Sequence, residues 1–371
     1  MVELMLSGLR NLPRTAGNGS RAVQIFHVNA KLSRDPQAIG QFEWFKVFLL
    51  LKYCLAALWW RLARGADTLY YIPAPGKRTA LYRDWIVMAT CRPLFRRIIF
   101  HWHAVGLGEW LETTATPWEK RVTHALLDKA DLNIVLSEFG GADANRFLPR
   151  KIDIVPNGIP DPCPDFDSAI LPERQKRFER RQFDQSTRFN VLFLGACTEA
   201  KGLFATLESI AWLNQHLSRK RSLASVSLVV AGDFPSKKER ERFDHRIAAD
   251  DLTGSTEYVG FATRETKYSL FRQSDCLCFP SVYHAEGQPV TIIEALAFGL
   301  PVIATRWRGI PELLFGCEAE LVDDQDPIAI GAAIELLISK PTSTAGREVF
   351  AKRFSLDRHL SDLSKALLAI P

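Results

Sequence analysis

The second half of the chain alternates short apolar runs with amphipathic stretches in a regular order. Apolar runs bounded by turn residues predict strands, and apolar positions three to four residues apart predict helices. The predicted strands are residues 188–195, 225–233, 256–261, 275–281, 301–306 and 319–324, and the predicted helices are 201–217, 236–251, 263–274, 289–299 and 327–340. Strands separated by helices build a parallel, doubly wound sheet, which binds ligands at the carboxyl ends of its strands.

The first half shows the same rhythm less regularly. Strands are predicted at 22–29, 68–73, 97–104, 132–138 and 151–158, with helices between them. Residues 2–12 have helical spacing and precede the first of these strands, so the usual opening strand and its glycine turn are expected to be missing. Gly17–Ser20 precedes a strand and no helix, which predicts a helix stop and a turn.

The pattern therefore predicts an α/β protein with two Rossmann-like domains facing a cleft. We expect an N-terminal, acceptor-side domain over residues 1–160 and a C-terminal domain over 188–349. Residues 161–187 combine prolines with a charge run and are interpreted as the linker. The last helix, about 350–371, is expected to pack back on the first domain.

Residues 42–65 are the most membrane-like part of the chain. Lys46, Lys52 and Arg61 interrupt the apolar run, so the segment is too short and too charged to span a bilayer. Cations beside tryptophans are typical of a helix that lies on a membrane surface. A helix that buries its aromatic residues in the domain core is the other interpretation.

Composition narrows the class of protein. With 371 residues, 47% apolar and 24% charged, the chain is large enough for two cores and has an ordinary globular composition. A net charge of +5 suits anionic small molecules or an anionic membrane surface, and no nucleic-acid motif is present. Seven cysteines without framework spacing favour free thiols in a reducing cytoplasm.

The sequence EGQPVTIIE, residues 286–294, contains a candidate anion site at a predicted helix start. Pro289 suits the first turn of a helix, which places Gly287 and Gln288 at its entrance. The amides of Val290 and Thr291 then have no intrahelical partners. Free amides and the helix dipole together make such a terminus a phosphate site.

Two carboxylates flank this helix start. Glu286 stands just before it, and Glu294 stands more than one turn inside it, among apolar residues. A carboxylate can accept two hydrogen bonds from a diol, and a sugar nucleotide carries diols on both sides of its diphosphate. Either residue alone could be a helix cap or a surface residue. Their joint spacing, with the helix start and the glycine turn that follows, favours a sugar-nucleotide site.

The stretch EGQPVTIIEALAFGLPVIAT resembles the E-x7-E signature of retaining family 4 glycosyltransferases, which belong to the glycosyl transferases group 1 and have the glycosyltransferase B fold. The segments LNIVLSE, IDIVPNGI, VLFLGACTEAKGL, SLVVAGD and YVGF stand in the order expected for this family. The resemblance covers nearly all of residues 97–340.

This resemblance implies catalytic roles for three residues. Glu286 would contact hydroxyls of the donor sugar, and Lys201 of EAKG would neutralise the diphosphate. His103 of HWHAVG would approach the transferred sugar, although a histidine on a strand can also be an ordinary core residue. The remaining donor-binding residues would be Glu294, which binds the ribose, together with Gly195, Gly287, Gln288, Val290, Thr291 and Arg308.

The chain departs from the family pattern at two positions. Ala196 stands where an arginine is common, and Arg308 stands where a glycine is common. We hypothesise that Arg308, or Arg306 near it, supplies the positive charge that is lost at position 196. The missing opening strand also leaves the acceptor-side contacts unassigned.

The resemblance implies transfer of a hexosyl group, with retention, from a nucleoside diphosphate sugar to a hydroxyl of a glycan or lipid-linked acceptor. The donor is a co-substrate, and neither a cofactor nor a metal ion is expected. Bacterial polysaccharide or glycolipid assembly is the expected process, in the cytoplasm or peripherally on the inner face of the plasma membrane. A catalytically inactive scaffold or partner protein is the main alternative, and a sugar-nucleotide epimerase is a third.

Overall fold

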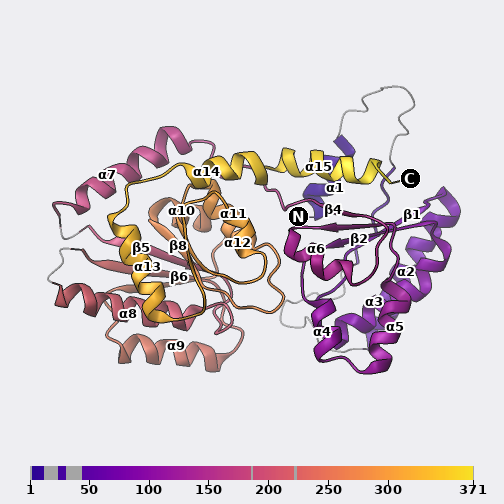
Figure 1. Cartoon of the computed structure of the whole chain (residues 1–371), viewed down its shortest axis with the longest axis horizontal. Coiled ribbons are helices and arrows are strands. Elements are labelled where there is room, and N and C mark those ends of the chain that lie inside the picture. Colours follow the sequence, from indigo (N-terminus) through magenta and orange to yellow (C-terminus); the bar gives the residue numbers. More distant parts are fainter. Residues whose placement is uncertain (1, 12–23, 31–43, 185–186, 221–223, 371) are drawn as a thin grey trace. The chain divides into compact units, whose positions relative to one another are not determined.

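The computed structural model describes residues 2–11, 24–30, 44–184, 187–220 and 224–370. They form two compact units (Figure 1). Unit 1 comprises Met1–Pro156 and His359–Pro371, and unit 2 comprises Asn157–Arg358.

Unit 1 contains a four-stranded parallel sheet in the order β1-β2-β3-β4. Its strands are β1 (Thr68–Tyr71), β2 (Arg97–Trp102), β3 (Leu132–Val135) and β4 (Ile152–Ile154). Its helices are α1 (Val2–Asn11), α2 (Trp44–Arg64), α3 (Arg78–Cys91), α4 (Leu107–Thr113), α5 (Pro117–Leu127) and α6 (Glu138–Asn145), with most of α15 (Leu356–Leu368).

Side chains of β2 alternate between two apolar cores, as the period of two in a strand requires. Phe100 and Trp102 pack in the core that includes residues of α3, α4, α5 and α6. Ile99 packs on the opposite face with Met5 of α1 and Leu363 of α15. The C-terminal segment of the chain thus completes one layer of unit 1.

Four of the five strands predicted in the first half are confirmed, and the helix at residues 2–11 is confirmed. The strand predicted at 22–29 is wrong, because the described residues 24–30 have no regular structure and none of them is buried. The Phe26 ring instead stacks on Trp60 of α2, with ring centroids 4.4 Å apart. The turn predicted at Gly17–Ser20 lies outside the described residues.

Unit 2 contains a six-stranded parallel sheet in the order β10-β9-β8-β5-β6-β7. All six predicted strands are confirmed, as β5 (Phe189–Leu194), β6 (Val226–Ala231), β7 (Thr256–Gly260), β8 (Cys276–Phe279), β9 (Val302–Thr305) and β10 (Ala319–Val322). The helices are α7 (Leu171–Arg181), α8 (Leu203–Arg219), α9 (Lys237–Ala249), α10 (Arg264–Gln273), α11 (Val290–Ala297), α12 (Ile310–Leu313), α13 (Pro327–Ser339) and α14 (Ala345–Val349). Two α/β units with parallel sheets agree with the predicted fold class.

The segment 161–187, interpreted as a linker, differs from that prediction because its described residues lie within unit 2. It contains α7, and the side chains of Phe166, Ile170 and Arg174 are buried. Arg181 pairs with the buried Asp275 at 2.9 Å. Part of the charge run therefore packs into unit 2, where a linker was predicted.

Helix α2 occupies the membrane-like segment and runs for 21 residues. It packs against α3 within unit 1 (Figure 1). Across the described ranges, no helix combines the length and apolar character that crossing a bilayer requires.

Candidate functional site

The carboxyl ends of β5 and β8 lie next to each other where the strand order of unit 2 reverses. Chain connections leave these two neighbouring strands in opposite directions along the sheet, which opens a crevice between their loops. The loop 195–202 follows β5, and the loop 280–289 follows β8. Nearly all of the predicted site residues lie on these two loops and on the first turns of α11.

A close backbone approach holds the two loops together. Gly202 has a φ of +83°, and a Cβ added to it would lie 2.4 Å from the Pro280 carbonyl oxygen. The Val282 amide donates to the Ala200 carbonyl across the same junction at 2.9 Å. Only glycine combines this φ with this contact, so Gly202 fixes Lys201 beside the loop that carries Glu286.

Lys201 and Glu286 form an ion pair in this junction. The Lys201 Nζ lies 2.5 Å from Glu286 Oε2, and the Ser281 hydroxyl donates to the same oxygen at 2.7 Å. The side chains are 20% and 9% exposed, respectively. The Lys201 ammonium also lies 4.7 Å from the centre of the Tyr283 ring. Cation and carboxylate are therefore held together at the edge of the sheet.

Glu294, in the second turn of α11, has its own lysine. Lys267 of α10 lies 2.5 Å from Glu294 Oε1, and the carboxylate side chain is 9% exposed. Burial raises the pKa of Glu294 above its usual value, and the Lys267 ammonium opposes that rise. The buried acidic residue within an apolar helix is thus paired, as electrostatics requires.

The start of α11 is open toward an anion. Pro289 occupies the N-cap, one residue before the predicted first turn, and no side chain caps the helix. The Ile292 and Ile293 amides both donate to the Pro289 carbonyl. By helix geometry the preceding amides, of Val290 and Thr291, have no intrahelical acceptor.

The loop before α11 is held by a segment from the start of unit 2. The Gln288 side-chain oxygen accepts a hydrogen bond from the Asn157 amide at 2.6 Å, and both residues are buried. Gln288 therefore orders the loop through its side chain, while Gly287 lies buried between it and Glu286.

The two arginines proposed to replace the charge missing at Ala196 differ in their contacts and backbone conformation. Arg306 pairs with Asp323 at 3.0 Å. Arg308 has a φ of +49°, in the left-handed region that disfavours side chains, and its guanidinium lies 5.1 Å from the Trp307 ring centre. A Cβ added to Gly195 would meet no atom within 4 Å, so space lies open at the end of β5.

His103 belongs to unit 1 and follows β2 directly. Its ring centre is 4.1 Å from that of His101, which is fully buried and hydrogen-bonded through Nδ1 to the Tyr70 hydroxyl. The two rings lie on the same side of the chain, as side chains two residues apart along a strand do. Burial lowers the pKa of His101 well below its usual value, and the His103 and His359 rings lower it further.

Sequence reasoning missed four residues of the site: Asn157, Lys267, Ser281 and Thr305. Thr305 is buried at the end of β9 and donates to the Ser281 carbonyl at 2.5 Å. Lys267 stands in a strongly charged helix where nothing local distinguishes it from its neighbours. The PNG turn that contains Asn157 belongs to the segment IDIVPNGI, but the contact of Asn157 with Gln288 joins residues 131 positions apart.

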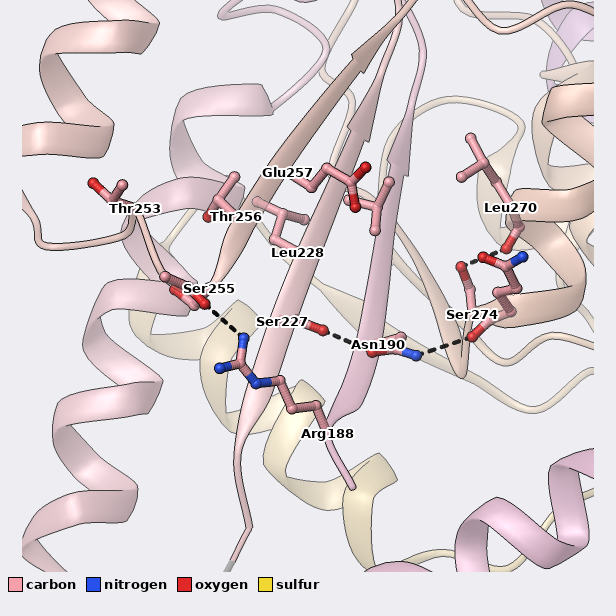
Figure 2. A pocket seen from close by; sticks show the side chains of 13 residues that line it. Arg188, Asn190, Ser227, Leu228, Thr253, Ser255, Thr256, Glu257, Leu270 and Ser274 are labelled. Atoms are coloured by element: carbon pink, nitrogen blue, oxygen red, sulfur yellow. Dashed lines mark hydrogen bonds between the residues drawn. The ribbon is translucent and has the colours of Figure 1, made fainter. Parts of the chain in front are cut away.

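A cavity of about 430 Å³ lies at the opposite, amino edge of the same sheet (Figure 2). Its polar groups bond to one another: Ser227 donates to Asn190 Oδ1 at 2.7 Å, and Arg188 donates to the Gly254 carbonyl at 2.6 Å. We place the functional site at the carboxyl edge, because parallel sheets bind their ligands there and because the first amides of α11, which have no intrahelical acceptor, lie there.

Comparisons with known proteins show which families and folds this chain resembles. Residues 175–353 match the family model described as Glycosyl transferases group 1. The amylovoran biosynthesis glycosyltransferase AmsK of Erwinia amylovora is 28% identical over 194 residues, covering 51% of this chain and 45% of AmsK. The putative colanic acid biosynthesis glycosyltransferase WcaL of Escherichia coli K12 is 26% identical over 196 residues, covering 49% and 46%. The chain thus spans less than half the length of these relatives.

The crystal structure of Anabaena HepE in complex with UDP and glucose has a similar fold. Its TM-score is 0.63 at 17% identity, over 89% of this chain and 84% of HepE. At this identity the likeness concerns the fold alone. Residues 175–353 of the chain are thus similar to the glycosyl transferases group 1 family, and its two parallel-sheet units have the glycosyltransferase B fold.

Proposed function

We propose that this protein is a retaining glycosyltransferase that moves a hexosyl group from a nucleoside diphosphate sugar to an acceptor hydroxyl. The observation that carries the proposal is the uncapped start of α11, which lies between two buried carboxylates that are each paired with a lysine. This arrangement offers positive groups for a diphosphate and acceptors for the diols on either side of it.

Departure of the diphosphate builds negative charge on its β-phosphate. In our proposal, Lys201 and the Val290 and Thr291 amides stabilise that charge, so the step needs no metal ion and no further cofactor. Glu286 accepts hydrogen bonds from the donor sugar, and Glu294 accepts them from the ribose. Lys201 would then be shared between Glu286 and the diphosphate. The role of His103 in unit 1 stays a prediction.

Arg308 is proposed to add a cation to the diphosphate subsite. Its positive φ supports this, because a strained non-glycine backbone is retained more readily where the side chain has a function. Arg306, which pairs with Asp323 at 3.0 Å, is the other candidate.

The acceptor and process are proposed from the relatives and from the N-terminal unit. AmsK and WcaL are named for the biosynthesis of amylovoran and colanic acid. We propose that this protein likewise extends a glycan or lipid-linked acceptor in polysaccharide or glycolipid assembly, from the cytoplasmic side of an anionic membrane.

The test is release of nucleoside diphosphate from a panel of UDP- and GDP-sugars. We expect one donor to be turned over slowly by water, and Glu286→Gln to lower that rate by about 100-fold or more, as removal of transition-state contacts does. The matched control is Glu335→Gln on α13, which removes a partly exposed carboxylate that pairs with Lys220. This substitution should leave the release rate unchanged. In the same assay Arg308→Ala should raise the donor Kd by about tenfold.

Two outcomes would contradict the proposal. Donor binding without release, unaffected by Glu286→Gln, would favour the catalytically inactive scaffold. Release of a changed sugar nucleotide in place of free diphosphate would favour an epimerase.

A further inference from the structure

Helix α2 exposes a row of large apolar side chains, which we call the stripe. Phe48, Leu55 and Leu62 follow one another at seven-residue intervals, and their side chains are 71%, 67% and 78% exposed. Phe45 and Trp59 flank them and are 68% and 54% exposed. Seven residues make nearly two helical turns, so these side chains lie along one side of the helix. No other described helix exposes more than two large apolar side chains.

The opposite side of α2 anchors it to unit 1. Leu50 and Cys54 are 5% and 4% exposed, and α2 packs against α3. At about 100° per residue, Leu50 lies about 140° and Cys54 about 100° around the helix from the middle of the line through Phe48, Leu55 and Leu62. The stripe is therefore the outward side of a docked helix, whose inward side is already satisfied.

The charges on α2 all have one sign. Its charged side chains are those of Lys46, Lys52, Arg61 and Arg64, and the helix contains neither Asp nor Glu. Lys52 and Arg64 are exposed, and Lys52 lies within the stripe between Phe48 and Leu55. The partner that complements this surface is both apolar and anionic.

A second copy of the chain would fit the apolar residues but not the charges. The stripe has the spacing of a coiled-coil seam, with Phe45, Lys52 and Trp59 in one row and Phe48, Leu55 and Leu62 in the other. Pairing two such helices would bring lysines and arginines together without an acidic residue on either helix to neutralise them. A bilayer with anionic headgroups accepts both the apolar residues and the cations.

We propose that the exposed stripe of α2 docks on an anionic lipid surface. The helix lies in the interfacial plane, with Phe48, Leu55 and Leu62 among the acyl chains and Lys52 and Arg64 at the headgroups. This deepens the proposed function, on which it rests, by naming the surface that brings the protein to a lipid-linked acceptor.

The test is sedimentation of the full chain with vesicles of phosphatidylcholine alone or mixed with phosphatidylglycerol. We expect binding to the mixed vesicles only, weakened by added salt. The triple substitution Phe48→Ser, Leu55→Ser and Leu62→Ser should weaken it by about tenfold or more. Lys52→Gln should weaken it by about fivefold. Phe183→Ser, at an 89% exposed position in unit 2, is the matched control and should bind as the wild type does.

Each substituted side chain is largely exposed, so the variants should fold, and their circular dichroism should match that of the wild type. The proposal is overturned if the triple variant sediments as the wild type does. It is also overturned if that variant loses a dimer seen by light scattering while vesicle binding stays the same, because the stripe would then join two copies.

Binding of UDP and GDP, measured separately, tests the donor site that is proposed in unit 2. A protein that binds vesicles but no nucleotide would contradict the proposed function and leave the lipid surface standing.

Discussion

At the residue scale, Glu294 depends on a lysine contributed by another helix. Lys267 lies 2.5 Å from the carboxylate and is 25% exposed. Lys267→Met would leave a buried carboxylate without its cation, so we expect the free energy of unfolding to fall by about 1–3 kcal/mol in urea titrations. Affinity for the donor nucleotide should fall as well, because Glu294 would shift toward its protonated form.

The matched control for this change is Lys237→Met. Its ion pair with Glu241 has side chains that are 90% and 63% exposed, so its loss should change stability by less than about 0.5 kcal/mol. Equal effects of the two substitutions would show that the Lys267 pair contributes nothing beyond an exposed one.

Two buried histidines in unit 1 should make stability depend on pH. His101 and His359 are 0% and 1% exposed, and burial lowers the pKa of each below its usual value of 6.5. Below pH 6.5 the unfolded chain binds protons that the folded chain does not. Stability is therefore full above pH 6.5 and falls as the pH decreases, by up to about 1.4 kcal/mol per pH unit for each histidine.

Urea titrations between pH 7.5 and 5 measure this slope. His101→Gln should flatten it, whereas His245→Gln, at an exposed position on α9, should leave it unchanged. A slope that is the same in wild type and His101→Gln would rule out His101 as its source.

Residues whose role depends on local sequence could be predicted, and residues whose role depends on distant partners could not. Glu286, Glu294 and Pro289 stand in one nine-residue stretch, where helix geometry alone relates them. Lys267 and Asn157 meet that stretch only through the fold, over 27 and 131 positions. Gln288 was predicted as a residue of the donor site, and its contact with Asn157 could not be read from spacing.

At the scale of elements, α11 has a free start and a tightly held end. Arg174 is 3% exposed and donates through Nη1 to the Phe298 and Gly299 carbonyls at 2.9 and 2.8 Å. Arg347 donates to the Ala297 carbonyl at 2.9 Å. Burial lowers the pKa of Arg174 to about 10, so the group remains a cation at neutral pH. Cations at the carboxyl end oppose the negative pole of the helix and leave its positive pole for an anion.

Arg174→Met should lower the free energy of unfolding by about 1–3 kcal/mol, because two buried carbonyls lose their donor. Donor affinity should also fall, since α11 would be held less firmly and the cation would be gone. Urea titration and nucleotide binding measure the two effects. Arg188→Met removes a bond to one exposed carbonyl at the far sheet edge and should alter neither strongly. Unchanged nucleotide binding in Arg174→Met would argue against a role of the helix end in the site.

Helices and strands with a strong hydrophobic period were predicted correctly. The errors arose at segments whose residue pattern is compatible with two different structures. The alternation in residues 22–29 is typical of a half-buried strand, but the Phe26 side chain packs on Trp60 of α2. The charged residues of 171–181 are typical of a solvated linker, yet Arg174 is buried against α11. In both cases tertiary contacts outweigh the local signal.

At the scale of the whole molecule, the chain passes from unit 1 to unit 2 after Pro156 and returns after Arg358. The number and kind of units could be predicted from the repeating pattern, because each sheet needs helices on both faces. The exact residue at which the chain changes unit could not, since proline-rich segments can pack as well as link.

The return of the chain makes unit 1 depend on its last helix. Leu363 of α15 is fully buried against the sheet with Ile99, Leu132 and Ile134. Leu363→Ala should lower the stability of unit 1 by about 2–5 kcal/mol, as cavity-forming substitutions do. Native-state hydrogen exchange should show this loss in the β2 and β3 amides and not in those of β5 and β6. Leu368→Ala, 63% exposed on the same helix, should change neither. Equal loss of protection in both sheets would mean that the units unfold as one, so the C-terminal helix would support the whole chain.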